Sequence, residues 1–450
     1  MTKDFCLPFQ ARARPALAGL TVLQLATDLE ATATTRLLFD LVNALSAADA
    51  RPFVASAGGR MKGELQTKGG VELAFPTQAK NPLAMALNCR RLADVIKSER
   101  VDLVHVRSRA LAWVAFGACR VTKTPLVTSF EAGTKQHRAV ARRYNSILAR
   151  GDFVLTSSRF AAELAARLYP AAADKIRMVP PGVDCQIFDP SKVSPDRVAA
   201  IRRHWKVAPH EQIILIAISP DSTGRGQSLV EATRLLAASG LSGVKFIVDR
   251  QMSGQDRALE RAIVRQGLQG LMDLAEERDR PAAYLAASAV VSLGQAKAAT
   301  EIALQAQAMG TPVIAASRGP ASEMILAPPK VEEGLRTGFL VKPGDGASLA
   351  IAIARILGLG ASAGAALSCR ARQYVETHFS TEQFCAATLA AYGSLIALRR
   401  GVVEDNEPEP DAMFRVASLQ KPEQKPHPAS ERDAKEWVPD FSLKSHVSSF

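Results

Sequence analysis

Short apolar runs alternate with stretches of helical periodicity from Leu20 to about Gly401, and this alternation limits the possible fold more than any other feature. The strand candidates of the N-terminal half are residues 21–27, 51–59, 71–76, 102–108, 125–131, 152–158 and 175–184. Those of the C-terminal half are residues 212–220, 244–249, 288–294, 311–317 and 338–345. Strands that alternate with helices form parallel sheets with helices on both faces, so the pattern predicts an α/β fold with two doubly wound sheets.

The length of the chain, 450 residues, favours two domains because a single hydrophobic core rarely grows this large. We expect an N-terminal extension over residues 1–19, a first Rossmann-like domain over 20–195 and a second over 200–380. The last helix, about 381–399, is expected to return to the first domain. Residues 402–450 are rich in Pro, Glu and Lys and poor in apolar residues, which predicts a disordered tail.

The formal net charge of +12 predicts an anionic partner, such as a nucleotide, a phosphorylated glycan, nucleic acid or an anionic membrane. We expect no nucleic-acid partner, because the chain lacks interleaved aromatic and basic residues and zinc-type spacing. Six cysteines without a CxxC pair indicate reduced thiols. The N-terminal residues lack the apolar core of a signal peptide, and residues 348–368 are typical of a helix and its cap. These features predict a cytoplasmic protein without a membrane span.

One predicted helix, which begins at Lys297 and ends at Gly310, carries two conspicuous polar residues in an apolar frame. These are Lys297 and Gln305. Each has a plain explanation, Lys297 as a solvated lysine at a helix start and Gln305 as a good helix former. The position of the helix just before the buried run 311–317 places it at the expected cleft between the sheets, where ligands of open α/β sheets bind.

The segments GVDCQIFDP (182–190) and QAMGTPVIAASRG (307–319) resemble the family-4 glycosyltransferases of GT-B fold. Residues 80–96, 101–113, 144–152 and 344–357 are similar to bacterial members that build lipopolysaccharide cores. The resemblance implies two facing Rossmann-like domains, with a nucleotide sugar bound mainly by the second and a glycan or lipid-linked acceptor bound by the first. It implies neither a metal nor another cofactor.

The resemblance also implies which positions would carry the chemistry, and this chain departs from the family at most of them. The family histidine aligns with Glu131, and the arginine and lysine that neutralise the diphosphate align with Pro220 and Arg225. The two glutamates that hold the donor sugar and ribose align with Lys297 and Gln305. We expect Arg225 and Lys297 to reach one anion at the N-terminal ends of their helices.

The glycine pair of the first loop aligns with residues 32–33, which are threonine and alanine here. Ser322 and Glu323 are expected near the anion site, with Glu323 as a possible cap of the following helix instead. Arg107 and Arg109 follow a predicted strand and would meet an acidic acceptor or form a plain surface cluster. His105, inside the same strand, is expected to be a satisfied core histidine.

Three interpretations remain open. The chain is a nucleotide-sugar glycosyltransferase, a GT-B pseudoenzyme that binds or supports a true transferase, or a transferase with a remodelled donor site. Replacing a glutamate with Lys297 adds two positive charge units, and replacing an arginine with Pro220 removes one, so the cation–phosphate contacts are misplaced at a site where a diphosphate must leave. We therefore expect little turnover with ordinary nucleotide sugars.

Residues 134–150 are predicted to form an amphipathic helix. Val140, Tyr144 and residues 147–148 share its apolar face, and three basic residues lie opposite: Lys135, Arg138 and Arg142. The apolar face is expected to pack on the first sheet. The basic face would attract anionic lipid headgroups and bring the protein to the inner face of the cytoplasmic membrane.

Overall fold

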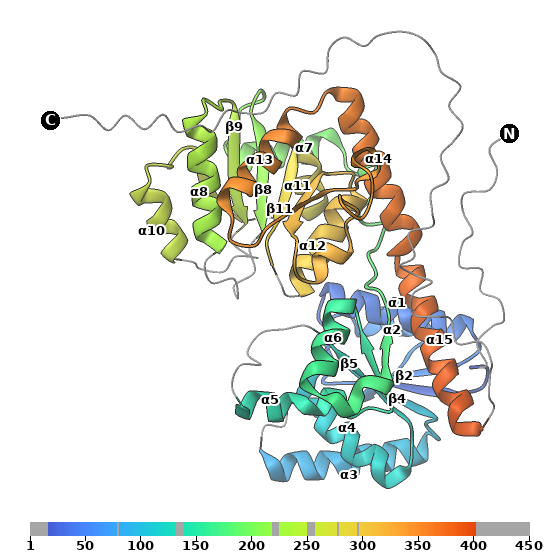
Figure 1. The fold of residues 1–450 in the computed structure, drawn as a ribbon. Coiled ribbons are helices and arrows are strands. Elements are labelled where there is room, and N and C mark those ends of the chain that lie inside the picture. Colours follow the sequence, from blue (N-terminus) through green and yellow to red (C-terminus); the bar gives the residue numbers. More distant parts are fainter. Residues whose placement is uncertain are drawn as a thin grey trace.

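The computed structural model describes residues 17–78, 81–131, 139–217, 225–249, 257–276, 279–294 and 297–401. Two parallel sheets, each covered by helices on both faces, form the two lobes seen in Figure 1. This architecture confirms the predicted α/β fold with two doubly wound sheets.

The first lobe contains a seven-stranded parallel sheet in the order β3-β2-β1-β4-β5-β6-β7. Its strands are β1 (Thr21–Leu25), β2 (Arg51–Ser56), β3 (Val71–Ala74), β4 (Leu103–Val106), β5 (Leu126–Phe130), β6 (Phe153–Thr156) and β7 (Ile176–Met178). Its helices are α1 (Ala33–Ala47), α2 (Lys62–Thr67), α3 (Pro82–Ser98), α4 (Arg109–Thr122), α5 (Ala139–Asn145), η1 (Ser146–Ala149), α6 (Arg159–Leu168) and η2 (Pro170–Lys175).

The second lobe contains a six-stranded parallel sheet in the order β10-β9-β8-β11-β12-β13. Its strands are β8 (Gln212–Ala217), β9 (Val244–Asp249), β10 (Met272–Ala275), β11 (Ala289–Ser292), β12 (Val313–Ala316) and β13 (Phe339–Val341). Its helices are η3 (Pro190–Lys192), α7 (Pro195–His204), α8 (Arg225–Ala238), α10 (Arg257–Arg265), α11 (Arg280–Ala286), α12 (Lys297–Ala308), η4 (Pro320–Glu323), η5 (Glu333–Leu335), α13 (Gly346–Leu357) and α14 (Ala361–His378). The long α15 (Thr381–Arg400) follows.

Every run that the sequence predicts as a strand contains one, and the sequence reading missed only β10 among the strands described here. The four residues of β10, MDLA, carry a polar residue and are mostly half-buried at the edge of the second sheet. A short edge strand lacks the continuous apolar run by which buried parallel strands are recognised.

The two faces of the first sheet bury different helices because successive strand residues point to opposite sides. Val22 of β1 packs in a cluster that includes residues of α1 and α15, whereas Leu23 packs in a cluster with residues of α3 and α4. The second sheet repeats this plan, with α11, α12 and α14 on one face and α8, α10 and α13 on the other. Each lobe therefore has its own core.

Helix α15 leaves the second lobe and packs beside α1 of the first, as both ribbon views show. Two segments cross between the lobes, and they are hydrogen-bonded to each other. The Val183 amide donates to the Phe379 carbonyl at 2.8 Å, and the Thr381 amide donates to the Val183 carbonyl at 3.1 Å. The paired crossings join the lobes through a short two-stranded bridge.

The structure corrects the predicted helix over residues 134–150. Of that range it describes residues 139–150, where the regular helix α5 ends at Asn145 and a 3₁₀ turn, η1, follows. The change of pitch takes Ile147 and Leu148 into the core, while Tyr144 stays 44% exposed. These three residues do not share one buried face. Lys135, Arg138 and the Val140 side chain lie outside the described part, as does the predicted disordered tail, residues 402–450.

Within the described ranges, no single helix is both long and apolar enough to cross a membrane. Helices α13 and α14 pass that test only as a pair, and the pair is bent by 110° at its break.

Candidate functional site

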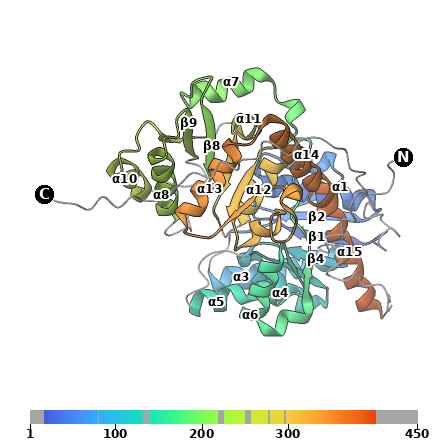
Figure 2. The ribbon, with the colours of Figure 1, turned by 45° about the horizontal axis from the view of Figure 1, so that its top comes forward.

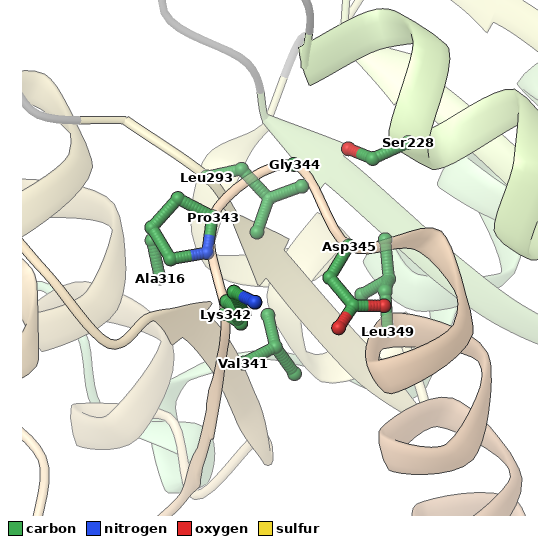
Figure 3. A pocket seen from close by; sticks show the side chains of 9 residues that line it. All are labelled: Ser228, Leu293, Ala316, Val341, Lys342, Pro343, Gly344, Asp345 and Leu349. Carbon is green, nitrogen blue, oxygen red and sulfur yellow. The ribbon is translucent and has the colours of Figure 1, made fainter.

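The carboxyl edge of the second sheet carries a small hollow between strand ends and helix starts (Figure 3). It encloses about 230 Å³, open solvent included. Its lining comes from the ends of β11, β12 and β13 and the first turns of α8 and α13: Ser228, Leu293, Ala316, Val341, Lys342, Pro343, Gly344, Asp345 and Leu349. The Asp345 carboxylate accepts the Ser348 amide at 2.9 Å and so caps α13.

Lys297 is the first residue of α12 and lies at the boundary between the lobes. Its Nζ atom is 3.9 Å from Oε1 of Glu131 in the first lobe and 3.8 Å from Oε1 of Glu301 one turn further along α12. The side chain is 36% exposed, so these ion pairs are screened by water and contribute little to stability. The position does place a cation at the contact between the two lobes.

Glu131 directly follows β5, at the carboxyl edge of the first sheet. The Ser157 hydroxyl, just after β6, donates to its Oε2 atom at 2.9 Å. Because carboxyl ends of neighbouring parallel strands meet at one edge, these groups form a polar cluster that Lys297 joins from the other lobe.

Gln305 does not join this cluster. Its side chain is only 6% exposed, and its Oε1 atom accepts the Tyr284 hydroxyl at 3.1 Å inside the second lobe. Ser322 is also engaged locally, with its hydroxyl donating to the Gly319 carbonyl at 2.7 Å. The structure therefore brings Lys297 and Glu131 together and turns Gln305 inward.

Glu323 caps a helix, but not the following one that the sequence reading considered. Its two carboxylate oxygens accept the backbone amides of Arg159 at 2.7 Å and Phe160 at 2.6 Å, in the first turn of α6 in the other lobe. Burial raises the pKa of the Glu323 carboxyl, and the two amide hydrogen bonds oppose that change. The contact links the two lobes.

Arg107 and Arg109 lie in different surroundings. Arg109 is exposed at the start of α4, and its Nη1 atom donates to Oδ1 of Asn145 at 3.2 Å. Arg107 points toward α15, with its guanidinium carbon 5.9 Å from the centre of the Phe384 ring. Its Nη2 atom is buried and has no hydrogen-bond partner within the part of the chain that the structure describes.

Part of the predicted donor site lies outside the described residues. This holds for Ser219, Pro220 and the Arg225 side chain, although the backbone of Arg225 begins α8. In the first loop, Thr32 caps α1, because its hydroxyl accepts the Thr35 amide at 3.2 Å. The glycine pair that the resemblance implies is therefore replaced by a capped helix start.

Sequence reasoning missed two groups at this boundary, Ser157 and the start of α6. The Ser-Ser pair at 157–158 before an apolar-periodic stretch is a helix-start signal, and Ser158 caps α6 through the Ala161 amide at 3.1 Å. The signal identifies the cap but not the carboxylate that sits on it. That partner comes from residue 323, far along the chain.

Two family models match the chain. Residues 34–187 match Glycosyltransferase Family 4, and residues 225–358 match Glycosyl transferases group 1. A D-inositol 3-phosphate glycosyltransferase of Xylanimonas cellulosilytica is 32% identical over 192 residues, which are 40% of this chain and 44% of the relative. One of Saccharomonospora viridis is 28% identical over 317 residues, 67% of this chain and 66% of the relative. The chain thus spans less than two thirds of the length of either.

Solved structures share the fold. A glycosyltransferase from Rickettsia africae superposes with a TM-score of 0.67 at 24% identity, covering 84% of this chain and 99% of that one. Anabaena HepE in complex with UDP and glucose gives a TM-score of 0.62 at 19% identity, over 85% and 100% of the two chains. WaaG, a glycosyltransferase involved in lipopolysaccharide biosynthesis, gives 0.56 at 14% identity, over 82% and 98%.

Proposed function

We propose that this chain, which belongs to the glycosyltransferases of GT-B fold, binds a nucleotide sugar or nucleoside diphosphate at the carboxyl edge of its second sheet. The observation that carries the proposal is the meeting of two helix starts, those of α8 and α13, around the hollow of Figure 3. Helix α12, which begins at Lys297, follows β11 of the same sheet. Backbone amides at helix starts bind phosphate, and Lys297 and Lys342 add positive charge.

The proposed reaction transfers a sugar to a glycan of the cell envelope, such as a lipopolysaccharide core. An acceptor hydroxyl oxygen forms a bond to the anomeric carbon, the bond from that carbon to the diphosphate breaks, and the hydroxyl proton passes to solvent. Lys297 would stabilise the charge that grows on the leaving diphosphate. The structural likeness to WaaG, a glycosyltransferase involved in lipopolysaccharide biosynthesis, supports an envelope acceptor. The D-inositol 3-phosphate in the names of the curated relatives supports an acceptor that carries an acidic group.

A second candidate is a catalytically inactive GT-B protein that binds nucleotide and supports a true transferase. It is favoured by the engagement of both positions where the family carries glutamates. Lys297 faces Glu131 and Glu301, and Gln305 is held by Tyr284 in the interior. Neither presents a carboxylate to a donor sugar.

Calorimetric titration with UDP, GDP, ADP and UDP-glucose tests the binding step. We expect one nucleotide to bind, and Lys297→Met to weaken that binding roughly 10-fold or more, as loss of a charge-assisted hydrogen bond does. Lys206→Met, an exposed change away from the cleft, is the matched control and should bind as the unmodified protein does. Absence of binding for all four nucleotides would contradict the proposal.

Release of UDP from UDP-sugars in the presence of acceptor glycans separates the two candidates. Acceptor-dependent release supports the transferase, whereas binding without release supports the inactive protein. We expect the double change Lys297→Glu and Gln305→Glu not to raise the rate of sugar transfer, because residue 220 remains proline and residue 305 points inward.

We also propose peripheral contact with anionic membrane at the inner face of the cytoplasmic membrane, where lipid-linked acceptors would lie. Its support is the net charge of +12 and the exposed Arg142 and Arg143 of α5. Basic residues near a surface of anionic lipid contribute about 1 kcal/mol each, which favours adsorption without anchoring.

A further inference from the structure

We propose that the Arg107 guanidinium is the anion-binding group of an acceptor subsite in the first lobe, which takes a phosphate or carboxylate group of the acceptor. The inference deepens the proposed function, on which it rests for the role of the bound molecule. Arg107 directly follows β4, so its backbone is fixed at the carboxyl edge of the first sheet.

Among the residues that the structure describes, none forms an ion pair with Arg107, and Glu131 acts on it only at longer range. Within the described ranges, no carboxylate oxygen lies within 4.0 Å of its nitrogen atoms, and the Nη2 atom is enclosed without an acceptor. The side chain as a whole is half-buried. A cation that is partly withdrawn from water without a partner is unfavourable, and proteins ordinarily pair it or bind an anion to it. The fork of N–H donors on a guanidinium fits the oxygens of phosphate and carboxylate groups.

The acceptor atoms around Arg107 are used by other donors. The Tyr392 hydroxyl oxygen accepts Nε2 of Gln24 at 2.9 Å and contacts Nδ1 of His105 at 2.6 Å. Glu131 accepts the Ser157 hydroxyl and faces Lys297. On the side of α15, Arg107 faces the Phe384 ring, which has a π face but no oxygen atom.

The electrostatics agree with this geometry. Burial lowers the pKa of Arg107, with Tyr392, Glu131 and Cys385 acting in the opposite direction. Burial and then the charge of Arg107 hold the pKa of His105 well below its ordinary value. The neighbouring histidine is thus kept neutral, and Arg107 is the cation that an incoming anion meets.

An acceptor, rather than the donor diphosphate, fits this position. Arg107 follows β4 of the first sheet and lies beside Phe384 in the first turn of α15. The helix starts proposed for the diphosphate belong to the second lobe. A first-lobe cation would select acceptors that carry an acidic group and discriminate against neutral sugars.

Thermal-shift and calorimetric titrations test the subsite with three probes: inorganic phosphate, glucose 6-phosphate and unphosphorylated glucose. We expect both phosphates to raise the melting temperature of the full chain and glucose to leave it unchanged. Arg107→Met should abolish the phosphate-dependent shift, and Arg107→Lys should retain part of it. Arg120→Met, a change at an exposed arginine on α4, is the matched control and should keep the full shift.

The melting temperature without ligand gives a readout that a merely structural arginine would not produce. Removing a half-buried charge that has no ion-pair partner among the described residues should leave Arg107→Met as stable as the unmodified protein or more so, while anion binding is lost. A lower melting temperature together with undiminished phosphate binding would overturn the proposal. So would the absence of any phosphate effect on the unmodified protein.

Saturation with UDP distinguishes the two sources of anion. Phosphate that still binds to the UDP-saturated protein, with loss in Arg107→Met, supports an acceptor subsite. Phosphate that UDP displaces would place the anion in the donor site and overturn the proposal. Failure of UDP itself to bind would contradict the proposed nucleotide site but not the Arg107 subsite, because the phosphate probes report on the latter independently.

Discussion

His105 shows how one side chain can tie the first sheet to the C-terminal helix. It lies within β4 and is 1% exposed, and both ring nitrogens have partners. Nδ1 contacts the Tyr392 hydroxyl of α15 at 2.6 Å, and Nε2 contacts the Ser129 hydroxyl of β5 at 2.9 Å. This confirms the expectation of a satisfied core histidine. Since burial and the charge of Arg107 hold its pKa well below the ordinary value, the folded protein keeps His105 neutral.

The neutral state of His105 predicts a loss of stability in mild acid. The unfolded chain takes up a proton on this residue below about pH 6.5, whereas the folded chain does not. The unfolded state therefore binds more protons, and stability falls as the pH drops, by up to about 2 kcal/mol at pH 5. The urea concentration at the midpoint of unfolding, measured at pH 7.5, 6 and 5, should fall less steeply with decreasing pH in His105→Gln than in the unmodified protein.

His204→Gln, at an exposed position, serves as the control for that series and should fall as steeply as the unmodified protein. A part of the slope should remain in His105→Gln, because burial also lowers the pKa of His378. Equal slopes in His105→Gln and the unmodified protein would show that His105 does not contribute.

At the scale of elements, the contact between Glu323 and α6 holds the two lobes together. A carboxylate at a helix start interacts with two free amides and with the positive end of the helix dipole, a combination that contributes about 1 kcal/mol. We expect Glu323→Ala to widen the distribution of interlobe distances, measured by paired spin labels on α3 and α10. Glu332→Ala, at an exposed position nearby, should leave it unchanged. Identical distributions for both variants would mean that other contacts hold the lobes.

A second prediction at the scale of elements concerns the close packing of the two segments that cross between the lobes. A Cβ atom added to Gly182 would lie 2.9 Å from Cβ of Phe384 and 3.2 Å from Cα of Thr381, at the start of α15. We expect Gly182→Ala to destabilise the chain by about 1–3 kcal/mol, since the overpacked crossing must shift.

Gly364→Ala tests the reverse case, because its added Cβ has nothing within 4 Å inside α14. That change should stabilise by about 0.5–1 kcal/mol. Chemical denaturation of both variants measures the difference.

At the scale of the whole molecule, the net charge of +12 governs association with surfaces. We expect co-sedimentation with vesicles of phosphatidylcholine and phosphatidylglycerol that rises with the anionic fraction and falls steeply with salt. Changing Arg142 and Arg143 to Gln should reduce it, whereas changing Arg202 and Arg203 of α7 in the second lobe removes the same charge as a control. Equal reduction by both pairs would assign the effect to net charge alone.

The sequence by itself determined the fold class and nearly every strand, because a buried parallel strand is a continuous apolar run that local reading detects. It also located α12 and the lysine at its start, since helix periodicity and a terminal glycine are local signals. The cap of α6 by Ser158 depends on residues three apart and so has a local signal of the same kind, although the sequence reading missed it. None of these features needs knowledge of the other lobe.

Tertiary structure alone decided which polar groups meet. Glu323 reaches an amide 163 residues away, Lys297 faces Glu131 across the cleft, and Gln305 turns to Tyr284 although it shares a helix with Lys297. Among the described residues, the Nη2 atom of Arg107 is left without an acceptor, because the neighbouring Tyr392, Gln24 and His105 bond to one another. Such pairings depend on how two lobes and a returning helix pack. The burial of apolar side chains, far from the polar atoms, sets this packing and therefore the distances between the polar groups.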